Sequence, residues 1–190
     1  STHKEWNGDD LHLCVRGEIR ETRVFGPNLV LRREISTKLG DNKLTVRDRV
    51  ENEGFEAAPL LILYHCNFGF PVVSEYSMIS APSQQCTPRD EAAQIGAENW
   101  MKLEAPQAGY AERVYFHQMQ PDENGIVRAE IWNHELDFGG YIAYKSETLP
   151  HFTQWKMMGA GTYVCGLEPS NAPLASRAEL KRRGELPMLE

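Results

Sequence analysis

Two residues able to exchange protons lie far apart in the chain, each beside an apolar stretch. Glu168 closes the alternating run TYVCGLEPSN, residues 162–171, and Pro169 follows it directly. Since proline has no N–H for a strand ladder, we expect the strand to stop at Pro169, with Glu168 as the carboxylate at its end. His65 follows the apolar run PLLILY and leads into CNFGFP, whose Gly and Pro indicate a turn.

Each residue also has an ordinary structural interpretation. An acid at a strand end is often a solvated edge residue, and a lone histidine is commonly a core residue bonded to a backbone carbonyl. Together they favour chemistry, because histidine can give or take a proton near neutral pH. A carboxylate at the end of a buried strand can also have its pKa raised by desolvation. One acid and one base suit proton transfer on a polar substrate.

The elements that must position these residues are mainly β-strands. Alternation of apolar and polar residues predicts strands at 11–15, 18–25, 28–35, 43–52, 111–119, 125–135, 139–147 and 152–158. The continuous apolar run 59–73 is typical of one strand buried on both faces. We expect a long loop at 83–109 and helix only within 173–186. Successive strands without intervening helices predict an all-β fold, an antiparallel β-sandwich.

Composition limits the class of protein. A chain of 190 residues fits one domain, 1–190, and a formal net charge of −7 disfavours a nucleic-acid partner. No apolar stretch approaches the roughly 20 residues of a membrane span, and the polar start STHKEWNGDD is no secretory signal. Four widely spaced cysteines without a CxxC pair favour reduced thiols and a cytoplasmic location. The start without Met predicts a domain incomplete at both ends, a fragment of a larger protein.

Three blocks of the sequence resemble the galactose mutarotase (aldose 1-epimerase) superfamily. LYHCNFGFP is similar to the strand and turn that carry its catalytic histidine, and residues 148–173 are similar to its closing region. With NLVLRREI at 28–35, these blocks are most similar to the branch of unknown function that is described as aldose 1-epimerase-like. The resemblance covers the chain from about Gly17 onward. It implies a large antiparallel supersandwich, of which this chain is the C-terminal portion, with a sugar cleft on a concave face.

The resemblance also implies a reaction. His65 matches the general acid and Glu168 the general base of an isomerase that interconverts sugar anomers. The glutamate takes the proton of the anomeric hydroxyl while the histidine protonates the ring oxygen, so that the ring opens and recloses on either face. The expected partner is a small sugar or sugar derivative, and the reaction needs no metal or organic cofactor. Both side chains should then open into one cleft, separated by about the width of a sugar ring.

Four further residues are predicted to bind the substrate. Asn67 shares the face of His65 if the strand continues. Trp155 offers a ring on which sugars stack, and Lys156 could donate to hydroxyl, phosphate or sulfonate groups. Asn171 could hydrogen-bond the base or a sugar hydroxyl. Core packing for Trp155 and turn formation for Asn171 are equally compatible with the sequence.

Other functions remain open. Mutarotases of this superfamily use a second histidine and an Asn-Arg element, and neither is placed in this chain. The main alternative is a carbohydrate-binding protein of the same fold without turnover. A glycoside hydrolase would need two carboxylates beside one bond, and a metal-dependent isomerase would need ligands at metal spacing. We expect His117 and His134 at the surface or an edge, and Trp132 packed within the sandwich.

Overall fold

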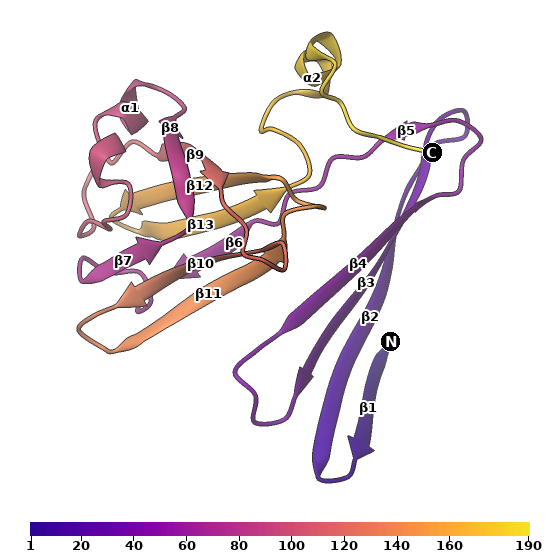
Figure 1. The fold of residues 1–190 in the computed structure, drawn as a ribbon, viewed down its shortest axis with the longest axis horizontal. Helices are drawn as coiled ribbons and strands as arrows, with labels where there is room; N and C mark the ends of the chain where they lie inside the picture. The colour runs from indigo at the N-terminus through magenta and orange to yellow at the C-terminus, as the bar shows by residue number, and fades with distance from the viewer. The chain divides into compact units, whose positions relative to one another are not determined.

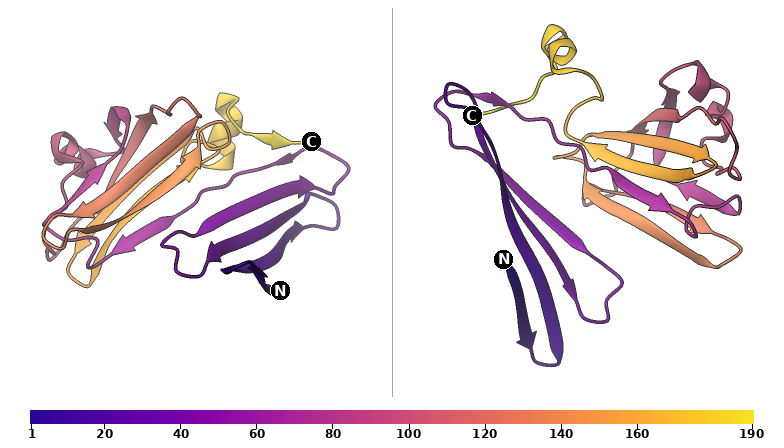
Figure 2. Two further views of the ribbon diagram at one scale, coloured as in Figure 1. Left: turned by 60° about the horizontal axis from the view of Figure 1, so that its bottom comes forward. Right: turned by 180° about the vertical axis from the view of Figure 1, so that it is seen from behind.

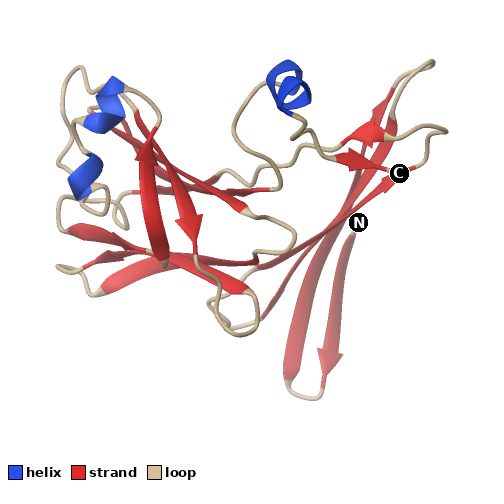
Figure 3. Ribbon diagram, turned by 45° about the horizontal axis from the view of Figure 1, so that its top comes forward, coloured by secondary structure: helices blue, strands red, loops and turns tan.

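The computed structural model describes residues 1–190, which fold as two compact units. Unit 1 comprises Ser1–Leu60 and Pro187–Glu190, and unit 2 comprises Leu61–Leu186. Strands predominate in both units (Figure 3), so the predicted all-β class is confirmed. No helix combines the length and the apolar character needed to cross a membrane.

Unit 1 is an antiparallel sheet of four strands in the order β1-β2-β3-β4, drawn in indigo and purple in Figure 1. The strands are β1 (Thr2–Asn7), β2 (Asp10–Thr22), β3 (Asn28–Lys38) and β4 (Thr45–Asn52). A second, two-stranded sheet pairs β5 (Ala58–Pro59) with β14 (Met188–Leu189). The strands expected at 11–15 and 18–25 form one long strand, and β1 occupies a polar segment where the alternation predicts none.

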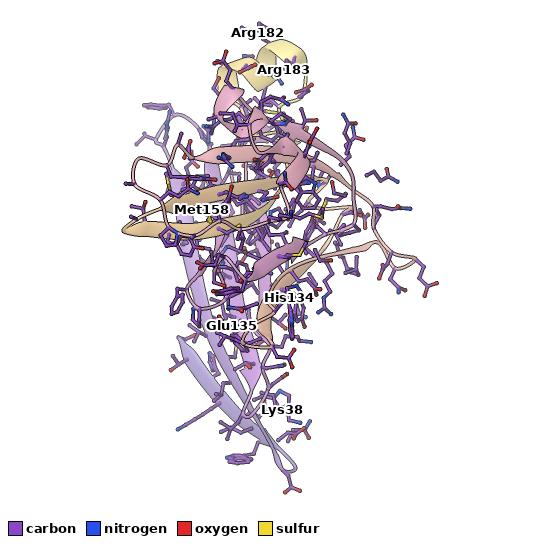
Figure 4. The ribbon with its side chains drawn as sticks, turned by 90° about the vertical axis from the view of Figure 1, so that its left-hand side faces the viewer. Lys38, His134, Glu135, Met158, Arg182 and Arg183 are labelled. Carbon is purple, nitrogen blue, oxygen red and sulfur yellow. The ribbon has the colours of Figure 1, made fainter.

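Unit 2 contains two antiparallel sheets, shown from further sides in Figure 2. The five-stranded sheet has the order β6 (Cys66–Gly69), β13 (Thr162–Ser170), β12 (His151–Gly159), β9 (Arg113–Met119) and β8 (Ser83–Pro88). The three-stranded sheet has the order β11 (Phe138–Lys145), β10 (Ile126–Asn133) and β7 (Ser77–Ser80). His134 and Glu135, labelled in Figure 4, begin the turn between β10 and β11.

The core of unit 2 is built from residues of both sheets. Ile79, Ala129 and Ile131 of the three-stranded sheet cluster with Phe152, Met158, Cys165 and Leu167 of the five-stranded sheet. Alternation along β10 turns Ala129 and Ile131 inward and Trp132 outward, where Trp132 is 39% exposed. The expectation that Trp132 packs within the sandwich is therefore wrong.

Helices are short and occur only in unit 2. They are α1 (Glu91–Gln94), the 3₁₀ helix η1 (Ala97–Asn99) and α2 (Arg177–Arg183). The Ser176 side chain accepts a hydrogen bond from the Glu179 N–H at the start of α2, and Gly184 ends the helix in the left-handed conformation. Arg182 and Arg183 lie in its last turn (Figure 4). The helix expected within 173–186 is confirmed, but the expectation that helix occurs only there is wrong, since α1 and η1 lie outside that stretch.

Two irregular stretches differ from the prediction. The run 59–73 is not one continuous strand, since only β5, a bridge from Leu63 to Ser170, and β6 make strand pairings. The backbone between β5 and β6 bonds instead to the end of β13, through Tyr64 N–H to Pro169 O at 3.0 Å. The stretch 83–109 is not a plain loop, because it contains β8, α1 and η1.

Candidate active site

The register of three neighbouring strands collects three of the six predicted site residues, Asn67, Trp155 and Glu168, on one face. Gly166 of β13 lies opposite Asn67 of β6 and opposite Trp155 of β12, and Glu168 lies opposite Thr153 of β12. Residues directly opposite each other in a ladder project to the same side of the sheet. Cys165 and Leu167 belong to the core. Because side chains alternate along a strand, Gly166 and Glu168 face away from the core.

Glu168 lies within its strand rather than at its end. β13 continues through Pro169, which pairs with Phe152, to Ser170, which pairs with His151. The carbonyl of Pro169 accepts from Tyr64, so this residue directs its backbone polar groups toward 61–65 and not toward β12. The missing N–H therefore leaves the β12 ladder intact, and the expected stop at Pro169 is wrong.

His65 and Glu168 are in direct contact. Nε2 of His65 lies 3.1 Å from Oε1 of Glu168, and the two side chains are 47% and 5% exposed, respectively. Nδ1 of His65 lies 2.8 Å from Oδ1 of Asn67. Because an amide oxygen only accepts, Nδ1 carries a proton and Nε2 is the atom presented to the carboxylate. The expected separation by the width of a sugar ring is therefore wrong for this conformation.

The environment of Glu168 favours its protonated form. Burial raises the pKa of the Glu168 carboxyl, His65 opposes this effect, and the negative charge of Glu112 adds to it. Oε1 is buried and has no hydrogen-bond partner, so the 3.1 Å approach of His65 Nε2 is a contact that becomes an ion pair when the imidazole is protonated. A carboxylate held in this way is a stronger base than one in water.

The indole ring of Trp155 contacts the imidazole ring of His65. The two ring centroids lie 5.4 Å apart with the planes at 77°, an edge-to-face contact. Nε1 of Trp155 donates to Oε2 of Glu112 at 2.9 Å, and Nη2 of Arg89 donates to the other oxygen of Glu112 at 2.8 Å. The Arg89 guanidinium also donates from Nε to Asp90 at 2.7 Å. This chain of bonds fixes the indole beside the imidazole.

Glu112 and Arg89 are site residues that the sequence reasoning missed. Glu112 stands two positions before Val114, the register partner of Trp155, and Arg89 directly follows β8. Their nearness to Trp155 depends on the order of strands in the sheet, which the sequence pattern does not reveal. Arg89 and Trp155 together hold the pKa of the Glu112 carboxyl below its usual value.

Two predicted substrate ligands lie elsewhere. Lys156 is fully buried, and its ammonium contacts Glu104 Oε2 at 2.9 Å and the backbone carbonyl of Lys102. It follows Trp155 in a strand and therefore points to the opposite face, so the predicted contact of Lys156 with a sugar beside Trp155 is wrong. Asn171 accepts from the Ile62 N–H through Oδ1 at 2.8 Å, and its own N–H donates to the carbonyl of Ile62. It thus anchors the segment that leads to His65.

His117 is buried, against the expectation of a surface or edge position. Its Nε2 lies 3.1 Å from Gln154 Oε1, and its Nδ1 lies 2.9 Å from Ser83 Oγ. Burial lowers the pKa of His117 to about 4. The ring faces the core together with Phe152, its neighbour in register on β12, so it is remote from the face that carries Glu168.

The structure offers no group of three or more His, Cys, Asp and Glu side chains arranged to hold a metal ion. All four cysteines are free thiols, as expected. This face carries a half-exposed imidazole against a buried carboxylate.

Comparison with known proteins places this chain in a family. A crystal structure described as a putative aldose 1-epimerase, from Klebsiella pneumoniae subsp. pneumoniae MGH 78578, matches with a TM-score of 0.91 and 25% sequence identity. The match covers 95% of this chain and 47% of that chain, so this chain spans about half the length of the structure. A comparison with curated proteins gave no match.

The strongest finding concerns the whole chain. The family model described as "Domain of unknown function (DUF4432)" matches residues 1–190. The all-β fold and the structural match confirm the resemblance to the galactose mutarotase-like fold. Because the family model spans every residue, the chain belongs to the DUF4432 family.

Proposed function

We propose that this chain carries the acid–base pair of an aldose 1-epimerase-type isomerase, which interconverts the anomers of a small sugar or sugar derivative. One observation carries the proposal: a buried carboxylate, Glu168, lies 3.1 Å from the solvent-accessible imidazole of His65. Burial raises the pKa of the first group, and Asn67 fixes the orientation of the second. Such an arrangement suits proton exchange with a bound hydroxyl compound.

The short separation is compatible with this reaction. The two oxygens that exchange protons in a cyclic sugar, the anomeric hydroxyl and the ring oxygen, are bonded to the same carbon. A carboxylate and an imidazole side by side can therefore reach one oxygen each from the same edge of the sugar. Trp155, held beside His65, can contact an apolar sugar face.

The reaction starts with Glu168 ionised and His65 protonated on both nitrogens. Glu168 takes the proton of the anomeric hydroxyl, whose electron pair forms the C1 carbonyl. The bond from C1 to the ring oxygen breaks, and the ring oxygen takes the proton from Nε2 of His65. After rotation about C1–C2, the ring hydroxyl attacks the other carbonyl face and returns its proton to His65. The carbonyl oxygen then takes back the proton from Glu168.

The test uses the full-length protein and NMR exchange spectroscopy across a panel of free and phosphorylated sugars. Glu168→Gln keeps the shape of the side chain but removes its basicity, so anomer exchange should fall by about 100-fold or more while sugar binding persists. His65→Asn should behave similarly. The double variant should lose little beyond the worse single variant, because the two groups act as one unit.

His134→Asn, in the exposed turn after β10, is the matched control and should exchange anomers at the wild-type rate. If the wild-type protein binds a sugar but exchanges its anomers no faster than buffer does, the proposed isomerase activity is refuted. The carbohydrate-binding protein of the same fold would then take its place.

A further inference from the structure

Gly166 occupies the centre of the candidate active site. In the ladder it lies between Asn67 on β6 and Trp155 on β12, the two residues that contact the His65 ring from either side. Glu168 follows two positions later on the same strand and face. The one position without a side chain thus has Asn67 and Trp155 on either side and Glu168 next to it on the same face.

The space above Gly166 is filled by the Glu168 side chain. A Cβ added to Gly166 would overlap Oε1 of Glu168 and would lie 3.3 Å from its Cδ and 3.4 Å from its Cγ. The carboxylate therefore folds back along its own strand, over the glycine. The same oxygen, Oε1, is the one that contacts Nε2 of His65.

Backbone conformation does not account for a glycine here. The glycines with positive φ in this chain include Gly161 and Gly184, whereas Gly166 is not among them. Any L-residue could adopt its extended conformation within β13. What the position requires is the absence of a Cβ.

We propose that Gly166 is a positioning residue: its missing side chain forms the hollow in which the Glu168 carboxylate reaches His65. The proposal gives a physical basis to the acid–base pair, and its importance for catalysis rests on the proposed function. The geometric part of the proposal is independent of the proposed function, because it concerns only which atoms occupy the space above Gly166.

A double-mutant cycle tests the geometry without any sugar. Gly166→Ala is compared in the wild-type background and in the Glu168→Ala background, by the midpoint of chemical unfolding of the complete chain. Because the added methyl collides with the Glu168 carboxylate, Gly166→Ala should lower the midpoint when Glu168 is present and leave it nearly unchanged when Glu168 is absent. The same loss in both backgrounds would overturn the proposal, and so would no loss in either.

Titration of the Glu168 carboxyl by carbon NMR gives a second readout that a general loss of stability would not move. In Gly166→Ala the carboxylate is displaced from its buried place, so the pKa of Glu168 should shift toward that of an ordinary glutamate. The matched control is Gly69→Ala on β6, where an added Cβ would meet nothing closer than Tyr163 O at 4.0 Å. It should leave the titration unchanged.

The outcomes separate the two proposals. If Gly166→Ala does not fold, the variant that also carries Glu168→Ala should fold, and its failure to do so would count against the hollow. An unchanged Glu168 titration in a folded Gly166→Ala protein would overturn the positioning role. Coupling of the two residues in a full-length protein that exchanges no anomers would instead retain the positioning role and refute the proposed function.

Discussion

Glu168 is a residue whose native environment disfavours its charge. Its side chain is 5% exposed, and Oε1 has no aligned donor. Burial accordingly raises the pKa of this carboxyl. A buried, poorly satisfied charge is a local instability that proteins retain mainly where chemistry uses it. The same interactions that make Glu168 a better base should therefore make the folded protein less stable.

This gives a prediction with a definite sign. Because the folded-state pKa of Glu168 is raised, its contribution to stability is fully present below the unfolded-state pKa and is lost as pH rises through the folded-state value. Glu168→Gln, which carries no charge, should therefore be more stable than wild type at pH 7, and the difference should vanish in acid. Urea unfolding of both proteins over a pH series measures it.

Glu112→Gln provides the comparison of opposite sign. Arg89 and Trp155 lower the pKa of the Glu112 carboxyl, so its charge stabilises the fold above the unfolded-state pKa and this contribution disappears as pH falls. Glu112→Gln should be less stable than wild type at pH 7. A Glu168→Gln protein less stable than wild type at that pH would contradict the inferred environment of Glu168, and a more stable Glu112→Gln protein would contradict that of Glu112.

Residue types at apolar strands identified His65, Asn67, Trp155 and Glu168 as candidates from the sequence, and the structure brings these four together. Lys156 shows how the same reasoning can fail. It is adjacent to Trp155 in an alternating strand, so the two side chains must face opposite sides of the sheet. The sequence pattern contained that signal.

At the scale of elements, period-two alternation was a dependable guide to the longer strands. It predicted β3, β4 and β9–β13 close to their observed bounds. It failed for the apolar run 59–73, because an apolar composition does not reveal where a backbone finds hydrogen-bond partners. The partners of that run include Pro169 and Asn171, more than 100 positions away.

The side chain of His117 contacts residues of two other strands that are far from it in the sequence. Ser83 begins β8, His117 lies on β9, and Gln154 lies on β12. The amide nitrogen of Gln154 donates to the carbonyl of Trp100, so its oxygen faces His117 and accepts from the Nε2 proton. Nδ1 lies beside Ser83 Oγ, whose own proton is donated to the carbonyl of Gln85 at 3.0 Å. Burial, rather than the hydrogen-bond partners, disfavours a second proton on this ring.

Acid should therefore weaken these elements through His117. Its pKa falls from 6.5 to about 4 in the folded protein, so between those values the unfolded state binds a proton that the folded state excludes. Stability should decrease by about 3 kcal/mol over this interval, at roughly 1.4 kcal/mol per pKa unit. Denaturant unfolding from pH 7 to 4 should show a smaller pH dependence for His117→Asn than for wild type.

The control for this experiment is His134→Asn, since His134 lies in the exposed turn after β10. Its pH dependence should match that of wild type. Because His117→Asn also removes packing, the diagnostic quantity is the change of stability with pH and not the stability at one pH. Equal slopes for wild type and His117→Asn would contradict the neutral buried ring.

At the scale of the whole molecule, the two units differ in how much core each contains. Every residue of the main hydrophobic cluster belongs to unit 2. In unit 1, β1 is exposed along its whole length. The apolar row Val15–Ile35–Val46 crosses its sheet, yet Val15 is 51% and Val46 is 48% exposed. A single sheet with an open apolar face lacks the second layer from which most domains derive their stability.

This difference predicts two regimes of amide hydrogen exchange in the chain of 190 residues. Peptides from β12 and β13, whose residues are mostly buried, should exchange only through large-scale opening of unit 2. Peptides from β1 and the exposed end of β2 should exchange through local opening, and therefore at least about 100-fold faster after correction for intrinsic rates. Mass spectrometry of peptic fragments measures both sets in one sample. Equal protection of β1 and β12 would contradict the prediction, because it would require unit 1 to be as stable as unit 2 despite the exposed apolar row.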